Sequence, residues 1–216
     1  MPDTSLRTVF GLVVPVKPAA VAKSRLAPLG DEARRELVVA FALDTVLAAL
    51  ACPLVAEVLV VTDDVRLAAG LRDHGVRSVP DGESGSLNAT LCQGAAELVR
   101  VRGDLRPVAL CADLPALRPD ELTRALQAAQ PTASFVVDAD GAGTTLYGAP
   151  TLASFRPRFG PSSREAHLTD GASDIRLSDI DSLRRDVDTP DDLRAAVGMG
   201  VGPRTSWVVT SRRLLG

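Results

Sequence analysis

The chain has 216 residues, of which 46% are hydrophobic and 24% are charged, and its formal net charge at pH 7 is −3. These values are typical of one globular domain spanning 1–216, long enough to bury a core without disulfide bonds. The net charge argues against a general binder of nucleic acid or of anionic membranes. The sequence shows neither a membrane-length apolar run nor a signal-peptide pattern, so we expect a cytoplasmic protein.

Strands and helices are predicted to alternate in the first half of the chain. The apolar run VFGLVVPV over 9–16 is typical of a strand that is buried on both faces. After it we expect, in order, a helix over 31–50 capped by Asp31, a strand over 57–62, a helix over 65–74, a strand over 77–80, a helix over 86–102 and a strand over 107–111.

The second half continues this alternation and ends in a tail. We expect, in order, a helix over 119–130, a strand over 133–137, a glycine-rich turn, a strand over 145–149, an irregular segment over 156–182, a strand over 185–188 and a helix that begins at Thr189 and Pro190. The tail over 203–216 either packs back onto the domain or mediates self-association. The pattern predicts an α/β domain with helices on both faces of a mostly parallel sheet, and a ligand site beyond the carboxyl ends of the strands.

The only two lysines of the chain, Lys17 and Lys23, follow the first strand in the stretch PVKPAAVAKSRLAPL. Arg25 adds a third cation, and the small residues between them would let a phosphate approach the backbone. Three cations can neutralise a triphosphate, with lysine making point contacts and arginine a planar fork. The alternative is a solvated basic loop. The sequence has no Walker motif.

Two acidic positions at the ends of predicted strands are candidates for a Mg²⁺ site. Asp113 in CADLPAL follows the strand at 107–111, and Asp188 in RRDVDTPDDL ends the strand at 185–188, where Asp186 shares its face. Such carboxylates are suited to holding Mg²⁺ against nucleotide phosphates. Asp113 could instead cap the following helix, and Asp188 alone is a weak signal. The pair is a stronger indication of a metal site than either residue.

Two polar turns are candidates for contacts with an anionic substrate. In DADGAGTT, Gly141 and Gly143 would expose backbone N–H groups to an anion, with threonine hydroxyls beside them. The alternative is a plain hairpin loop. In FGPSSREAH a short polar turn precedes His167, which we interpret as structural or solvated rather than as a catalytic base.

Nothing in the sequence resembles a nucleophile elbow, a paired Cys/His site or a Ser/His/Asp set. An attacking phosphate would need no general base, because its second pKa is about 6 and it is largely ionised at pH 7. Catalysis then consists of alignment and charge neutralisation, which lysines, an arginine and two metal-holding aspartates would supply.

In chain order, five motifs resemble those of the CofC/FbiD family, the guanylyltransferases of coenzyme F-420 biosynthesis. They are V-K-x-x-x-x-x-K-S-R-L, A-D-L-P-A-L, D-x-x-G-x-G-T, F-G-P-x-S with a later His and Gly-Ala, and D-V-D-T-P-D-D-L, within about 13–205. The resemblance implies a fold of the nucleotide-diphospho-sugar transferase (GT-A, Rossmann-like) type. It also implies transfer of GMP from GTP to the phosphate of a three-carbon acid, with release of pyrophosphate.

The likeness is greatest to the actinobacterial branch of the family, which implies phosphoenolpyruvate as the acceptor and enolpyruvoyl-diphospho-5'-guanosine as the product. Other branches are associated with 2-phospho-L-lactate or 3-phospho-D-glycerate, which differ from phosphoenolpyruvate by a double bond or one hydroxyl. The resemblance further suggests that an unstable product is handed to the next enzyme of the pathway.

Site residues also carry over by resemblance. The implied Mg²⁺ ligands, which are also catalytic, are Asp113 and Asp188. The implied triphosphate contacts are Lys17, Lys23 and Arg25, the last two also catalytic. Asn88 is expected near the guanine or ribose, and the implied acceptor pocket consists of Thr144, Gly160 and Ser163. One departure is Ala142, which stands where a threonine or similar residue is expected.

Two rival functions are weighed against this one. A molybdenum-cofactor guanylyltransferase usually carries A-G-G-x-S-x-R-M after the first strand, where this chain has VPVKPAAVAKSRL. A nucleotide-binding module without turnover would have little use for both Asp113 and Asp188. We therefore expect an enzyme.

Overall fold

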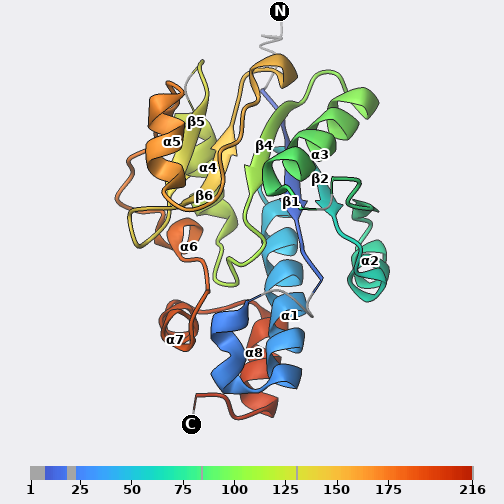
Figure 1. The fold of residues 1–216 in the computed structure, drawn as a ribbon, viewed down its shortest axis with the longest axis vertical. Helices are drawn as coiled ribbons and strands as arrows, with labels where there is room; N and C mark the ends of the chain where they lie inside the picture. The colour runs from blue at the N-terminus through green and yellow to red at the C-terminus, as the bar shows by residue number, and fades with distance from the viewer. Residues whose placement is uncertain (1–7, 19–22, 84, 130, 216) are drawn as a thin grey trace, which may run out of the picture.

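A seven-stranded sheet forms the centre of the computed structural model, which describes residues 8–18, 23–83, 85–129 and 131–215 (Figure 1). The strand order is β3-β2-β1-β4-β6-β5-β7. The strands are β1 (Phe10–Pro15), β2 (Val55–Val61), β3 (Arg77–Val79), β4 (Arg106–Leu110), β5 (Ser134–Val137), β6 (Thr144–Gly148) and β7 (Ser173–Asp174). Among the pairings described, only those made by β6 are antiparallel, so the predicted mostly parallel sheet is confirmed.

Helices cover both faces of this sheet. They are α1 (Asp31–Leu50), α2 (Val65–Arg72), α3 (Leu87–Val101), α4 (Pro119–Ala128), α5 (Ser163–Thr169), α6 (Asp181–Arg184), α7 (Pro190–Met199) and α8 (Pro203–Ser211), with 3-10 turns over Ser24–Leu29 and Leu152–Ser154. In the part of the chain described here, no helix combines the length and the apolar character that crossing a membrane requires.

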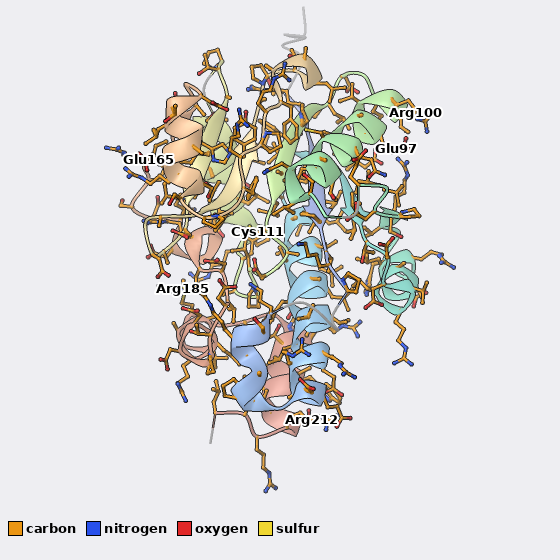
Figure 2. All side chains as sticks on the ribbon, in the orientation of Figure 1. Glu97, Arg100, Cys111, Glu165, Arg185 and Arg212 are labelled. Atoms are coloured by element: carbon orange, nitrogen blue, oxygen red, sulfur yellow. The ribbon has the colours of Figure 1, made fainter. Side chains whose placement is uncertain are left out.

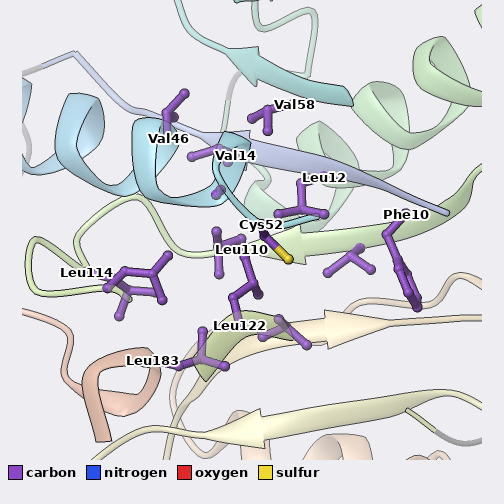
Figure 3. Close-up of a cluster of buried hydrophobic side chains, with 14 of the residues drawn as sticks. Phe10, Leu12, Val14, Val46, Cys52, Val58, Leu110, Leu114, Leu122 and Leu183 are labelled. Carbon is purple, nitrogen blue, oxygen red and sulfur yellow. The ribbon is translucent and has the colours of Figure 1, made fainter. Parts of the chain in front are cut away.

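The alternation of side chains along β1 explains the three layers. Leu12 and Val14 point to one face and pack with apolar residues of α1, α2, α4 and α6, as Figure 3 shows for part of this cluster. Val13 points to the other face and packs with apolar residues of α3. β1 therefore carries apolar side chains on both faces, as expected for a central strand of a parallel sheet that helices cover on both sides.

Close packing holds α3 against the centre of the sheet. A Cβ atom at Gly94 would lie 2.5 Å from Cγ1 of Val13 and 3.0 Å from Cγ2 of Val61, closer than side chains approach one another. Glycine at this point lets the helix backbone approach β1 and β2. The first turns of α3 consequently lie near the carboxyl end of β1, where Leu87 and Leu91 line a cavity together with Pro15.

The tail over 203–216 packs back onto α1 wherever it is described (Figure 1). The buried carboxylate of Asp44, inside α1, accepts hydrogen bonds from the backbone N–H groups of Arg204 (3.1 Å) and Thr205 (2.8 Å) at the start of α8. Near the other end of α8, Arg212 binds Glu32 and Glu36 of α1. An aspartate of a neighbouring helix thus accepts from N–H groups in the first turn of α8, where a helix offers no backbone acceptor of its own.

Three expectations about local structure are wrong. Asp31 is the first residue of α1 and Gly30 occupies the cap position. The segment over 156–182 is not irregular throughout, because it contains α5, β7 and the start of α6. No strand forms over 185–188, where the chain is coil after α6 and the N–H of Val187 donates a single backbone bond to the carbonyl of Asp113 (3.0 Å). The segments over 156–182 and 185–188 contain only short apolar runs, which have no periodic pattern from which a helix or strand could be predicted.

Candidate active site

A cavity of about 430 Å³ opens at the carboxyl ends of β1 and β4. The residues that line it are Pro15, Val16, Lys17, Lys23, Ser24, Arg25, Val38, Phe41, Leu87, Leu91, Leu110, Cys111, Ala112, Asp113, Phe159 and Asp188. Figure 2 labels Cys111 near the middle of the view, where the chain leaves β4. The predicted location of the ligand site at this edge of the sheet agrees with the cavity.

Three carboxylates meet at this edge of the sheet, and two of them, Asp113 and Asp188, line the cavity. Asp113, Asp186 and Asp188 each offer an oxygen, and the three oxygens lie within 4.8 Å of one another. The backbone bond from Val187 to Asp113 brings the two segments together. Oδ1 of Asp113 is buried and has no hydrogen-bond partner among the described residues. An unpartnered buried carboxylate oxygen is costly, so this group is suited to holding a divalent metal ion.

Crowding of negative charge also affects the protonation of Asp186. The pKa of its carboxyl is raised to about 7, mainly by burial and then by the negative charge of Asp113, against the opposing effect of Lys23. Such a shift in a group beside other carboxylates is common at functional sites. A bound cation would reverse it by favouring the ionised form.

Lys23 connects the basic stretch to these carboxylates. Its ammonium group binds both Asp113 and Asp188. Burial lowers the pKa of Lys23, but the charges of the two aspartates outweigh this effect and raise it above its ordinary value. The residue adopts the left-handed backbone conformation, with φ of 55°, directly before the 3-10 turn over Ser24–Leu29. A strained backbone at a residue that bridges two acids is typical of a functional position.

The other two predicted cations line the same cavity. Lys17 and Arg25 are both exposed, so their charges are available to a ligand that enters from solvent. The structure therefore brings Lys17, Lys23 and Arg25 together at one opening. Positions 19–22 of the basic stretch lie outside the described residues.

Thr144 and Ser163 are part of a buried hydroxyl cluster next to the cavity. Oγ of Ser163 donates to Oγ1 of Thr144 (3.1 Å), and Oγ1 of Thr144 lies 3.1 Å from Nδ1 of His167. The thiol of Cys111, which lines the cavity, donates to the carbonyl of Thr144 (3.4 Å). Gly160, with φ of 138°, lies in the turn between Phe159 and Ser163. The two hydroxyls are thus adjacent to the cavity and already bonded to each other.

His167 is a structural residue, in agreement with one of the two interpretations made from the sequence. It is fully buried in α5, where its ring stacks on Tyr147 (4.6 Å between centroids) and Phe135 (5.2 Å). Nε2 accepts a hydrogen bond from the backbone N–H of Arg158 (2.9 Å). Burial lowers the pKa of His167 to about 4, so the ring is neutral at pH 7.

The glycine-rich segment is a hairpin turn that joins the antiparallel strands β5 and β6. Asp138 accepts hydrogen bonds from the N–H groups of Ala142 (3.0 Å) and Gly143 (2.8 Å). Those two N–H groups are therefore already bonded to a carboxylate of the chain itself. Of the two interpretations made from the sequence, the hairpin loop therefore describes this segment better than the anion-binding loop.

Asn88 faces a loop. Its amide nitrogen donates to the carbonyl of Phe159 (3.0 Å), and its amide oxygen accepts from the N–H of Phe159 (2.8 Å). Phe159 lines the cavity whereas Asn88 does not. The expected contact of Asn88 with the nucleotide stays a prediction.

Comparison with known proteins assigns the family. The family described as guanylyl transferase CofC like matches residues 10–207, which is most of the chain. The chain belongs to this family. Phosphoenolpyruvate guanylyltransferase of Thermomonospora curvata is 52% identical over 198 residues, with 91% of this chain and 87% of the relative covered. The enzyme of the same name from Streptomyces coelicolor is 50% identical over 207 residues, with 95% and 98% covered.

Solved structures support the same fold for this CofC-like guanylyl transferase. A nucleotidyl transferase from Methanothermobacter thermautotroptrophicus superposes with a TM-score of 0.65 at 25% identity, with 88% of this chain and 97% of that one covered. A Desulfovibrio desulfuricans G20 protein described as a nucleotide-diphospho-sugar transferase gives 0.68 at 16% identity, with 96% of both chains covered. The expected nucleotide-diphospho-sugar transferase-like fold is confirmed.

Sequence reasoning left two residues of the CofC-like site without a role. Asp186 was expected to share a face with Asp188, but it was not included among the metal ligands. Phe159 was part of a motif without being a candidate contact. The signal for Asp186 was available in the D-V-D spacing, whereas the position of Phe159 depends on Asn88 and could not be read locally.

Proposed function

We propose that the chain is a phosphoenolpyruvate guanylyltransferase, which transfers GMP from GTP to the phosphate of phosphoenolpyruvate in coenzyme F-420 biosynthesis. The products are enolpyruvoyl-diphospho-5'-guanosine and pyrophosphate. One observation carries the proposal. Three cations and two carboxylates line the cavity at the carboxyl ends of β1 and β4, with Asp186 beside those carboxylates, in a chain about half identical to enzymes of that name.

The reaction needs little acid–base chemistry from the protein. An oxygen of the acceptor phosphate forms a bond to the α-phosphorus of GTP, and the bond from that phosphorus to the oxygen bridging to the β-phosphorus breaks. The electron pair leaves with pyrophosphate. Because the acceptor phosphate is already largely ionised at pH 7, no group must remove a proton. This agrees with the buried, neutral state of His167, both of whose ring nitrogens are bonded within the protein.

The cations bind the triphosphate in this proposal. Lys17 and Arg25 are exposed at the opening and attract the β- and γ-phosphates, while Lys23 lies deeper, between the opening and the acids. A positive charge held close to the transferring group stabilises the negative charge that develops on the leaving pyrophosphate. Lys23 and Arg25 are therefore assigned catalytic roles.

Asp113 and Asp188 would hold Mg²⁺, with Asp186 as a third oxygen donor. The donor set fits this ion, because it consists of hard carboxylate oxygens and includes the unpartnered Oδ1 of Asp113. Bound Mg²⁺ would neutralise phosphate charge. The protein's own contribution is to fix the acids, which the backbone bond between Val187 and Asp113 does.

The turn with Gly160, together with Thr144 and Ser163, would hold the carboxylate of the acceptor. These residues lie beside the cavity, because Cys111, which lines it, bonds to Thr144, and Phe159, which also lines it, directly precedes Gly160. The acceptors 2-phospho-L-lactate and 3-phospho-D-glycerate remain alternatives, because one hydroxyl or one double bond separates them from phosphoenolpyruvate. The same proposal includes a location in the cytoplasm and transfer of the product to the next enzyme of the pathway.

The test supplies purified protein with GTP and Mg²⁺ and adds each of the three acids in turn, while pyrophosphate release is measured. We expect release that depends on phosphoenolpyruvate, with the guanylylated product identified by mass spectrometry or captured by the next enzyme. Faster release with another acid would refute the choice of acceptor. No release with any acid would refute the proposed function.

A further inference from the structure

The side chain of Asn88 holds the backbone of a residue that is distant in sequence. Asn88 is the second residue of α3 and is half-buried. It bonds to both the N–H and the carbonyl of Phe159, at 2.8 and 3.0 Å. Two bonds in opposite directions fix the plane of the amide and the peptide groups on either side of Phe159. Such a two-point contact orients a loop more strictly than one bond does.

The turn that follows Phe159 needs external support. Gly160 and Ser162 have φ of 138° and 56°, both in the region that L-residues rarely adopt. Within the turn, the N–H of Ser163 bonds to the carbonyl of Gly160 (3.1 Å). A strained backbone persists only where its surroundings hold it. Asn88 supplies part of that support from α3.

Further contacts hold the same turn at its other points. The N–H of Arg158 donates to Nε2 of His167 (2.9 Å), and Oγ of Ser163 donates to Oγ1 of Thr144 (3.1 Å). The ring of Phe159 lies edge-on to His167, 5.7 Å between centroids, and lines the cavity that contains Asp113. The turn is therefore fixed between the β6–α5 region and α3, and Asn88 makes the contact from α3.

We propose that Asn88 is a positioning residue for the acceptor acid, which acts by holding Phe159 and so fixing the turn of Gly160 and Ser163 beside the acids of the cavity. This inference rests on the proposed function, because it takes that turn as part of the acceptor pocket. It differs from the expectation that Asn88 contacts guanine or ribose, since its amide is already bonded to Phe159.

The experiment compares Asn88→Ala with Gln93→Ala. Gln93 lies in the same helix and holds a different loop in the same way, by accepting from the N–H of Gly82 (3.0 Å) and donating to the carbonyl of Pro80 (3.1 Å). For each variant, KM is measured for phosphoenolpyruvate and for GTP, and binding of a non-hydrolysable GTP analogue is measured by calorimetry. Thermal unfolding of each variant records the purely structural cost.

We expect Asn88→Ala to raise KM for phosphoenolpyruvate tenfold or more, with KM for GTP and binding of the analogue within twofold of the unmodified protein. Gln93→Ala should leave KM for phosphoenolpyruvate unchanged. If Asn88→Ala does not fold, Asn88→Asp replaces it. That variant keeps the acceptor for the N–H of Phe159, places an oxygen against its carbonyl, and is expected to show the same split.

Weaker binding of the GTP analogue to the Asn88 variants would overturn the inference in favour of nucleotide contact. A loss of thermal stability without a change in either KM would overturn it in favour of a structural role. Failure of the proposed function is seen separately, because the unmodified protein would then release no pyrophosphate with phosphoenolpyruvate.

Discussion

Acid should destabilise this protein through His167 over a defined range of pH. The histidine is fully buried and its folded pKa is about 4, below the ordinary value of 6.5. Since the folded pKa is lowered, the stabilisation is complete above pH 6.5 and is lost as the pH falls towards 4. Between pH 7 and pH 4.5 the unfolded chain gains a proton that the folded ring does not, which costs about 2.5 kcal/mol of the free energy of unfolding.

Urea unfolding of the protein and of His167→Gln, at intervals of half a pH unit, measures this effect. Many carboxylates titrate in the same range, so the informative quantity is the difference in unfolding free energy between the two proteins. It should shrink by about 2.5 kcal/mol from pH 7 to pH 4.5, because glutamine does not titrate. The control is His74→Gln, which replaces the other histidine of the chain, at an exposed position. A difference between the unmodified protein and His167→Gln that stays constant with pH would refute the assignment of a buried neutral ring.

Four further predictions concern the site and the packing. Asp113→Asn and Asp188→Asn should each abolish pyrophosphate release while Tm stays within a few degrees, and normal turnover by either would remove its metal-binding role. Lys23→Ala should lower kcat/KM for GTP by about 10²-fold or more, as expected for loss of a cation at the transferring phosphate, and a change of only a few-fold would exclude that role. Asp44→Ala should lower the free energy of unfolding by about 2 kcal/mol in urea titrations, because two N–H groups of α8 lose their acceptor. Gly94→Ala should cost about 1–3 kcal/mol in the same measurement, since its Cβ would meet Val13 at 2.5 Å, and an unchanged midpoint would mean that α3 can move away from the sheet.

The central part of the fold could be predicted because its signals are local. The run over 9–16 is apolar at nearly every position, and in a sheet covered on both faces most of those side chains are buried. Parallel strands end at one edge, so residues that follow β1 and β4 had to lie near one another. That rule alone places Lys17 and Asp113 at the same cavity.

The segments that could not be predicted depend on contacts between distant residues. The turn over 139–143 looked able to bind an anion, but the carboxylate of Asp138 already occupies two of its N–H groups. α5 has only seven residues, and its inward side chains include Ser163 and His167, which form a polar network instead of an apolar stripe. No periodicity search identifies such a helix, because its burial is compensated by hydrogen bonds.

The coil over 185–188 shows how an incorrect local prediction can still place two acids correctly. A strand would have put Asp186 and Asp188 on one face by alternation. In the structure they flank Val187, whose fully buried side chain packs in the same apolar cluster as Leu26, three residues after Lys23. One apolar cluster therefore anchors Asp186, Asp188 and the lysine that binds Asp188. The backbone bond from Val187 to Asp113 adds the third acid, which the same lysine also binds. The charged groups of the cavity are positioned by the burial of their uncharged neighbours, which is why neither motif revealed the site alone.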